Sequence, residues 1–125
     1  MADPPTLVLV VDDDPVILRL LEVNFEMEGF EVLTAADGEA GLAVAVARQP
    51  DVIVSDVMMP RMSGLELARA LKADAATATI PLILLSAKAQ VHDVRAGMDA
   101  GVDDYLTKPF EPLELVDRVN ALLGT

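Results

Sequence analysis

The segment Leu7-Val-Leu-Val-Val-Asp-Asp-Asp14 joins five consecutive apolar residues to three carboxylates. A run that is apolar throughout, instead of alternating with polar residues, indicates a strand that is buried on both faces. Such strands belong to parallel sheets covered by helices on both sides. The acids that follow would lie at the carboxyl end of the strand, where open parallel sheets bind ligands. The segment therefore predicts an α/β fold with a polar site at one edge of its sheet.

Four further apolar segments follow at fairly even intervals and are also interpreted as strands. They are residues 30–35, 52–54 and 82–85, and a shorter segment around Tyr105 and Leu106. The segments between them carry apolar residues three and four positions apart, which indicates helices. This alternation predicts a (βα)5 doubly wound parallel sheet of five strands, flavodoxin-like, with strand order 2-1-3-4-5.

Helix starts are predicted from capping residues. Asp14 stands before Pro15, and an acidic cap followed by proline at the first helical position is typical of a helix start. Asp37 is a second candidate cap, and Glu111 before Pro112 is expected to cap the last helix in the same way.

Length and composition predict one domain and exclude several kinds of site. The chain has 125 residues, of which 53% are hydrophobic and 24% charged, so we expect a single domain over 1–125 with a core of about 6–123. No apolar run is long enough to cross a bilayer and no basic secretory signal begins the chain, which predicts a cytoplasmic protein. The absence of cysteine and the single histidine exclude disulfides, thiolate nucleophiles and multi-histidine metal sites.

The net charge of −12 bears on possible partners. A surface this acidic repels phosphate backbones and anionic lipids. We therefore expect no direct nucleic-acid partner and no membrane partner.

Polar residues follow the central predicted strands and would meet at one edge of the sheet. Asp12 and Asp13 follow the first strand, and Asp56 follows the third. Carboxylates at close range raise one another's pKa or recruit a cation. Because the available ligands are hard oxygens, the expected cation is Mg²⁺, with Mn²⁺ as a substitute.

A hydroxyl and a lysine complete a predicted anion site at the same edge. Ser86 ends the fourth strand and Lys108 follows the fifth, so both can contact phosphoryl oxygens. Asp56 is then the candidate carboxylate nucleophile for in-line attack on a phosphoryl group.

These residues resemble the receiver domain of two-component response regulators, the CheY-like family, over essentially the whole chain. The motifs that carry the resemblance are Val10-Val-Asp-Asp-Asp14, Asp51-Val-Ile-Val-Ser-Asp-Val-Met-Met-Pro-Arg-Met-Ser-Gly64, Leu84-Leu-Ser-Ala87 and Gly101-Val-Asp-Asp-Tyr-Leu-Thr-Lys-Pro-Phe110. The resemblance implies a phosphorylation-activated signalling switch that is not an enzyme in the usual sense, although it promotes its own phosphotransfer and autodephosphorylation. It also implies a sensor histidine kinase, a phosphotransfer protein or a small phosphodonor as the source of the phosphoryl group.

The same resemblance assigns roles around the phosphoacceptor Asp56. Asp13 would bind Mg²⁺ directly, Asp12 would help through water, and the backbone carbonyl of Met58 would be a further ligand. Lys108 would contact the phosphoryl group.

The resemblance also implies a switch and a means of tuning it. Ser86 would be the switching hydroxyl and Tyr105 the aromatic residue that turns inward when Ser86 moves. The peptide bond between Lys108 and Pro109 would be cis. Met58 and Lys88 would lie at the rim of the site, where we expect them to shield the phosphoryl group and so set its lifetime.

Phosphorylation is expected to remodel the surface formed by the fourth helix, the fifth strand and the fifth helix. That surface could contact a second copy of the chain, giving a homodimer, or an output domain or protein that the sequence leaves unidentified.

Three other classes are weighed against this interpretation. Haloacid dehalogenase-like phosphatases also use an aspartyl phosphate, but their pattern has an acid two positions after the nucleophile, where this chain has Met58. A constitutive, non-phosphorylated protein-binding module is the main alternative, although its usual signature, a lost acid or lysine, is missing. A dinucleotide-binding fold is disfavoured because acids stand where a glycine-rich phosphate loop is needed.

Overall fold

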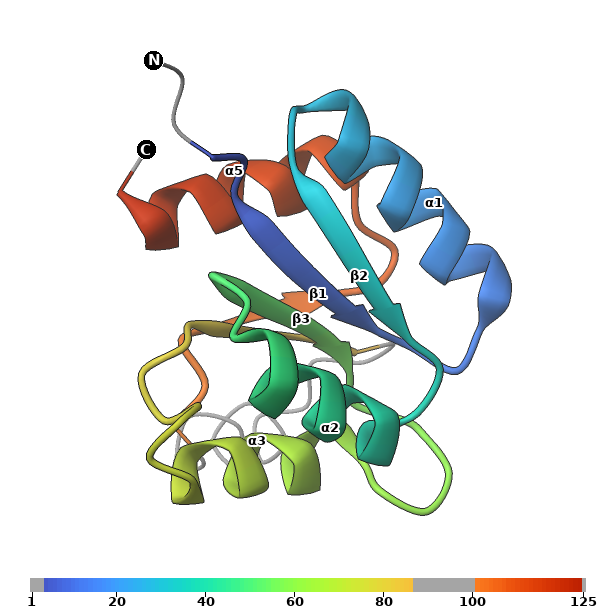
Figure 1. The fold of residues 1–125 in the computed structure, drawn as a ribbon. Coiled ribbons are helices and arrows are strands. Elements are labelled where there is room, and N and C mark those ends of the chain that lie inside the picture. Colours follow the sequence, from blue (N-terminus) through green and yellow to red (C-terminus); the bar gives the residue numbers. More distant parts are fainter. Residues whose placement is uncertain (1–3, 87–100, 125) are drawn as a thin grey trace.

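The structure is a computed structural model that describes residues 4–86 and 101–124. Five parallel strands form one sheet in the order β2-β1-β3-β4-β5, which confirms the predicted topology (Figure 1). The strands are β1 Leu7–Val11, β2 Glu31–Ala35, β3 Val52–Asp56, β4 Leu82–Ser86 and β5 Asp104–Thr107. The third and fourth strands each extend further than predicted, to the polar residues Asp56 and Ser86.

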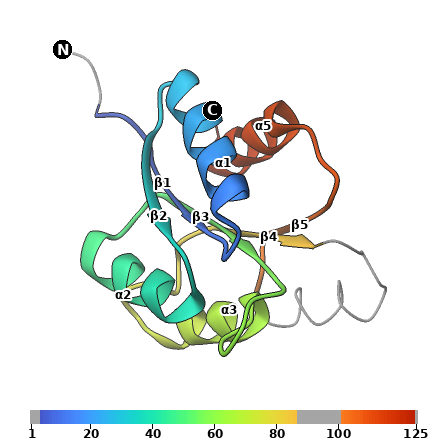
Figure 2. The ribbon, with the colours of Figure 1, turned by 90° about the vertical axis from the view of Figure 1, so that its right-hand side faces the viewer.

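Helices cover both faces of the sheet, as the apolar strands require. The described helices are α1 Pro15–Met27, α2 Gly38–Arg48, α3 Gly64–Ala73 and α5 Pro112–Leu123. Helices α1 and α5 lie on one face, and α2 and α3 lie on the other (Figures 1 and 2). The predicted fourth helix and Lys88 fall within 87–100, outside the described residues. Among the helices that are described, none has the length and apolar character needed to span a membrane.

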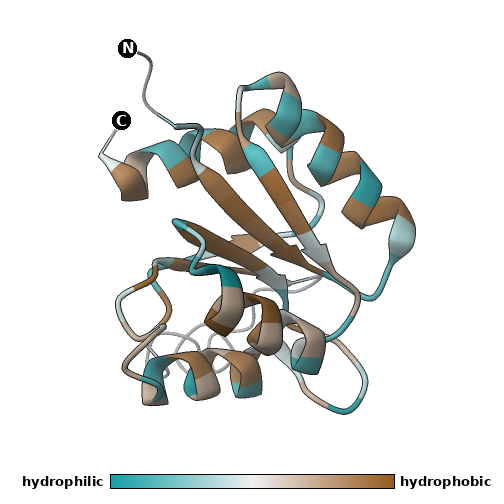
Figure 3. Cartoon of the chain, in the orientation of Figure 1, coloured by the Kyte–Doolittle hydropathy of each residue, from teal (hydrophilic) through white to brown (hydrophobic). Residues whose placement is uncertain are grey.

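Two separate apolar cores result from the alternation of side chains along each strand. Leu9 and Val11 of β1 pack with α2 and α3, whereas Val8 and Val10 pack with α1 and α5. Strand β1 is accordingly apolar along its whole length, as the hydropathy colouring shows (Figure 3). This arrangement explains why the run at the start of the chain is apolar at every position.

The helix caps confirm two of the three predictions. Asp14 Oδ1 accepts a hydrogen bond from the Val16 N–H at 2.9 Å, and Asp37 Oδ1 accepts one from the Ala40 N–H at 2.8 Å. The predicted start of the last helix is correct, since α5 begins at Pro112 with Glu111 at the cap position, but Glu111 does not form the expected side-chain capping bond. The longer glutamate side chain is poorly suited to this short-range bond, which Asp, Asn, Ser and Thr make readily.

Candidate functional site

Three carboxylates meet at the carboxyl edge of the sheet. Strands β1 and β3 are parallel neighbours, so the residues that follow β1 lie beside the end of β3. Asp12, Asp13 and Asp56 each place a carboxylate oxygen within 4.8 Å of the others. Asp12 and Asp56 are only 1% and 6% exposed, whereas Asp13 is exposed. The sheet topology therefore brings together all three acids that the sequence analysis predicted to meet.

Asp12 has one oxygen that is satisfied and one that is not. Its Oδ1 accepts a hydrogen bond from the Asp14 N–H at 2.9 Å. Its Oδ2 is buried and has no hydrogen-bond partner among the described residues, although Lys108 Nζ lies 3.5 Å away in an ion pair. A buried carboxylate oxygen that lacks a hydrogen bond is costly unless a cation approaches it. Asp12 Oδ2 therefore depends on a nearby cation for its stabilisation.

Within the part of the chain that the structure describes, Lys108 forms ion pairs with two of the three acids, Asp12 and Asp56. Its Nζ donates a hydrogen bond to Asp56 Oδ1 at 3.2 Å. The backbone places it there, because the Lys108 N–H donates to the Ser86 carbonyl at 2.6 Å and the following bond, to Pro109, is cis. One ammonium group faces two buried carboxylates, so the described site retains excess negative charge.

The carboxyl groups of the two buried acids are harder to ionise than usual. Burial raises the pKa of Asp12, and repulsion by Asp56 raises it further. Burial also raises the pKa of Asp56, although Lys108 opposes this effect. Both groups therefore bind protons more tightly in the folded chain than in the unfolded chain. Ionising these two carboxyl groups therefore destabilises the fold. The free energy of unfolding falls as the pH rises from the pKa of the unfolded chain through the raised pKa of the folded chain.

The donor set fits Mg²⁺. It consists of carboxylate oxygens, one of which, Asp12 Oδ2, accepts no hydrogen bond from the described residues. Mg²⁺ prefers such hard oxygens and needs only one or two carboxylates when it also binds water or phosphate. A divalent cation would offset the excess charge of the cluster, so the residues present suit this ion.

Ser86 lies on β4, the strand next to that of Asp56, and Tyr105 lies on β5, one strand further along the sheet. Asp56 is paired in register with Leu85, which places the buried Ser86 one residue further along β4. Tyr105 is half-buried and packs against the core on the α2 and α3 face. Its hydroxyl is buried and has no hydrogen-bond partner among the described residues.

The loop from Asp56 to α3 presents methionines of opposite exposure. Met58 is 72% exposed, whereas its neighbour Met59 packs in the core. Lys88, the other predicted rim residue, is outside the described residues.

The start of α3 packs directly on the backbone of Asp56. A Cβ atom at Gly64 would overlap the Asp56 carbonyl oxygen, so only glycine fits there. A capping box fixes this helix end, because Ser63 Oγ accepts from the Glu66 N–H and Glu66 Oε1 accepts from the Ser63 N–H, both at 3.2 Å. The sequence analysis missed this box, although the spacing Ser63-Gly-Leu-Glu66 is its known signature.

Comparison with known proteins identifies related sequences. A family model for the response regulator receiver domain matches residues 8–120. The chain is 47% identical over 116 residues to the DNA-binding dual master transcriptional regulator RpaA of Synechocystis, covering 93% of this chain and 48% of RpaA. It is also 47% identical to the phosphate regulon transcriptional regulatory protein PhoB of Pseudomonas aeruginosa, covering 93% and 51% respectively. The chain thus spans about half the length of these curated relatives.

Solved structures share the fold over nearly the whole chain. The chemotaxis protein CheY4 of Vibrio cholerae matches with a TM-score of 0.90 and 33% identity, covering 94% of this chain and 98% of CheY4. The receiver domain of sensor histidine kinase PA1611 from Pseudomonas aeruginosa matches with a TM-score of 0.89 and 30% identity, covering 98% and 100%. That receiver holds a magnesium ion coordinated in its active site cleft.

Mg²⁺ should stabilise the folded chain because it relieves the repulsion within the acidic cluster. At ten times its dissociation constant it should add about 1.4 kcal/mol, which raises the melting temperature by about 5 °C at this chain length. Asp12→Asn keeps an oxygen for the Asp14 N–H but removes a buried charge. We expect this variant to melt higher than the wild type without Mg²⁺ and to respond less to the ion, as measured by calorimetry.

Asp117→Asn removes an exposed acid from α5 and is the matched control. It should keep the full response to Mg²⁺. An equal response in both variants would contradict a metal site at Asp12.

Proposed function

The chain belongs to the response regulator receiver domain family, and from this membership we propose how its residues act as a phosphorylation-activated signalling switch. Receivers of this family take phosphoryl groups from histidine kinases and bind Mg²⁺ at their acidic pocket. We propose that Asp56 is the phosphoacceptor. The observation that carries this proposal is the buried Asp56 carboxylate at the end of β3, which contacts Lys108 and lies beside Asp12 and Asp13.

The proposed chemical step is attack by an Asp56 carboxylate oxygen on phosphorus. A new P–O bond forms while the P–N bond of a phosphohistidine, or the P–O bond of acetyl phosphate, breaks and the leaving group keeps the electron pair. Lys108, now paired with Asp56, can transfer its hydrogen bonds to the phosphoryl oxygens. Mg²⁺, held by Asp13, Asp12 through water and the Met58 carbonyl, would neutralise charge on the phosphoryl group, and we propose Mn²⁺ as a substitute.

The proposed switch starts at Ser86, which can contact the phosphoryl group and so favour the active arrangement. Tyr105 lies on the neighbouring strand β5, paired with Leu84 of β4, and its hydroxyl makes no hydrogen bond to the described residues that a change of packing would have to break. Close by, Arg118 of α5 forms two hydrogen bonds to Asp104 of β5, both at 2.9 Å. We propose that this surface, with the fourth helix, contacts a second copy of the chain or an output protein.

The prediction of no nucleic-acid partner is not supported, because close relatives are DNA-binding regulators. The chain corresponds to about half of each of them. We propose only that the 125 residues of this chain, whose net charge is −12, do not themselves form a DNA-contacting surface. A cytoplasmic location is part of the same proposal.

An apolar surface beside the acidic cluster is the proposed docking site for the phosphodonor protein. A hollow of about 390 Å³ is lined by Ile17, Leu20, Lys108, Pro109 and Phe110. Lys108 borders both this hollow and the acidic cluster, so a protein seated here has a phosphohistidine within reach of Asp56. Leu20 is 44% exposed at its edge. Exposed apolar groups of this kind are typical of protein interfaces.

Acetyl phosphate should add one phosphoryl group to the purified chain only when Mg²⁺ is present. Asp56→Asn should abolish the adduct because the amide is a far poorer nucleophile than the carboxylate, and Asp117→Asn should leave it intact. Intact mass measures both. If the wild type accepts nothing, from acetyl phosphate or from a histidine kinase, the chain is instead a constitutive binding module. Retained phosphorylation of Asp56→Asn would place the acceptor elsewhere.

Leu20→Ala should slow transfer from a phosphorylated histidine kinase by about tenfold, since loss of a good apolar interface contact costs about 1.4 kcal/mol. It should not change the rate with acetyl phosphate, which needs no docking surface. Met27→Ala is the matched control, because Met27 is an exposed apolar residue at the other end of α1. Equal rates for both variants with the kinase would exclude docking at Leu20.

Met58→Ala should shorten the lifetime of the phosphoryl group by more than twofold, since its exposed side chain can hinder the approach of water to the acyl phosphate. The decay of the phosphorylated mass over time measures this rate. Lys88→Ala tests the second rim position in the same assay. A change below about twofold in both, or roughly 0.4 kcal/mol of barrier, would show that neither side chain shields the group.

A further inference from the structure

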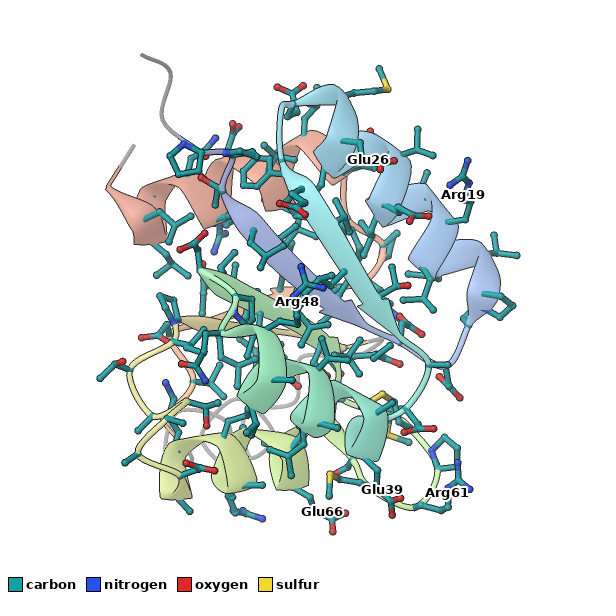
Figure 4. All side chains as sticks on the ribbon, in the orientation of Figure 1. Arg19, Glu26, Glu39, Arg48, Arg61 and Glu66 are labelled. Atoms are coloured by element: carbon teal, nitrogen blue, oxygen red, sulfur yellow. The ribbon has the colours of Figure 1, made fainter. Side chains whose placement is uncertain are left out.

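The loop that joins β3 to α3 contains a strained turn close to the acidic cluster. The Met62 N–H donates a hydrogen bond to the Pro60 carbonyl at 2.8 Å, and the residue between them, Arg61, has φ of 68°. These two observations define a γ-turn of the rare, left-handed kind. Figure 4 shows Arg61 on this loop, beside the first turn of α2. Glycine would adopt this conformation without strain, so the surrounding contacts must hold Arg61 in place.

The first of these contacts is the close approach of the Gly38 backbone to both the side chain and the carbonyl of Met62. Gly38 is the first residue of α2 and is buried. A Cβ atom at Gly38 would lie 2.8 Å from Met62 Cγ and 2.9 Å from both its Cβ and its carbonyl oxygen. The carbonyl oxygen cannot give way as the end of a flexible side chain can. The start of α2 therefore sits directly on the loop, with no room for another atom.

The second contact runs through Asp37, which joins the helix to the turn. Its Oδ1 caps α2 through the Ala40 N–H, and its Oδ2 accepts a hydrogen bond from Arg61 Nη2 at 3.4 Å. This second bond is long and exposed, so it contributes less than the packing of Gly38. One carboxylate nonetheless orients both the helix and Arg61.

The loop is short and closed, so a shift at Met62 has few places to be absorbed. Its two ends meet, because the Gly64 N–H donates to the Val57 carbonyl at 2.9 Å. Val57 is also tied to β4, since its N–H donates to the Leu85 carbonyl at 2.9 Å. Met58 stands between the buried Val57 and the buried Met59. A displacement of Met62 must therefore shift the short segment between Met62 and Met58, and with it the Met58 carbonyl.

We infer that Asp37 and Gly38, at the start of α2, are positioning residues that hold the β3–α3 loop so that the Met58 carbonyl faces the metal site. The inference rests on the proposed function, in which this carbonyl is a metal ligand. The start of α2 then sets the affinity of the site for Mg²⁺, although neither residue belongs to the acidic cluster.

The test is the dissociation constant for Mg²⁺, measured by NMR titration of backbone amides, with the melting temperature recorded for each variant in EDTA. Gly38→Ala pushes Met62 away from α2 and should weaken Mg²⁺ binding by about tenfold. Gly101→Ala is the control, because Gly101 has φ of 89° and lies against Lys72, ahead of β5 at the far edge of the sheet. It should lower the melting temperature but keep the dissociation constant within twofold of the wild type.

Two milder variants keep the inference testable if Gly38→Ala does not fold. Asp37→Asn preserves a capping oxygen and removes the charge that faces Arg61, and Arg61→Gly removes both the ion pair and the strain. Each should weaken Mg²⁺ binding about threefold, and saturating Mg²⁺ should restore their phosphorylation by acetyl phosphate to the wild-type rate. Unchanged dissociation constants in all the folded variants would overturn the inference and leave the contact a purely structural one. If the wild type itself binds no Mg²⁺, the proposed metal site is wrong. That result differs from one in which the wild type binds Mg²⁺ and the variants bind it equally well, which would contradict only the role of Asp37 and Gly38.

Discussion

The burial of Asp12 and Asp56 beside a single lysine is the constraint on which the site depends. Two carboxylates that burial makes hard to ionise share Lys108, and one Asp12 oxygen has no hydrogen bond. Such a cluster is poorly stabilised by itself, and both Mg²⁺ and a phosphoryl group would change its charge balance strongly. The fold tolerates this local cost because two apolar cores stabilise the sheet from either side. The sheet and its two cores thereby hold the mutually repelling carboxylates of Asp12 and Asp56 in place.

The connections around Asp56 show how one charge can influence a large part of the molecule. Its backbone carbonyl lies under the start of α3, its side chain binds Lys108 after β5, and its strand pairs with β1 and β4. A change in charge at Asp56 is therefore felt directly by elements that are distant in sequence. This proximity is the physical basis on which the proposed phosphorylation of Asp56 would act on β1, β4, α3 and Lys108 at once.

The order of the strands and the convergence of Asp12, Asp13 and Asp56 could be predicted because they depend on features visible in the sequence. Continuous apolar runs predict a covered parallel sheet, and parallel strands bring their following residues to one edge. The missing capping bond at Glu111 agrees with the weak capping tendency of glutamate, which the residue type alone indicates. The turn at Arg61 could not be predicted in the same way, because it depends on contacts between segments, such as Gly38 against Met62. Local sequence patterns carry no record of such contacts.

The sheet separates two cores that have no buried residue in common. Substitutions that repack α1 and α5 therefore have little mechanical effect on α2 and α3, and the reverse also holds. Each layer of helices can acquire a new binding preference while the core of the other layer stays as it is, provided that the helix starts that pack on the β3–α3 loop are left unchanged. After gene duplication, two copies of such a chain could come to bind different partners by changing one layer of helices at a time.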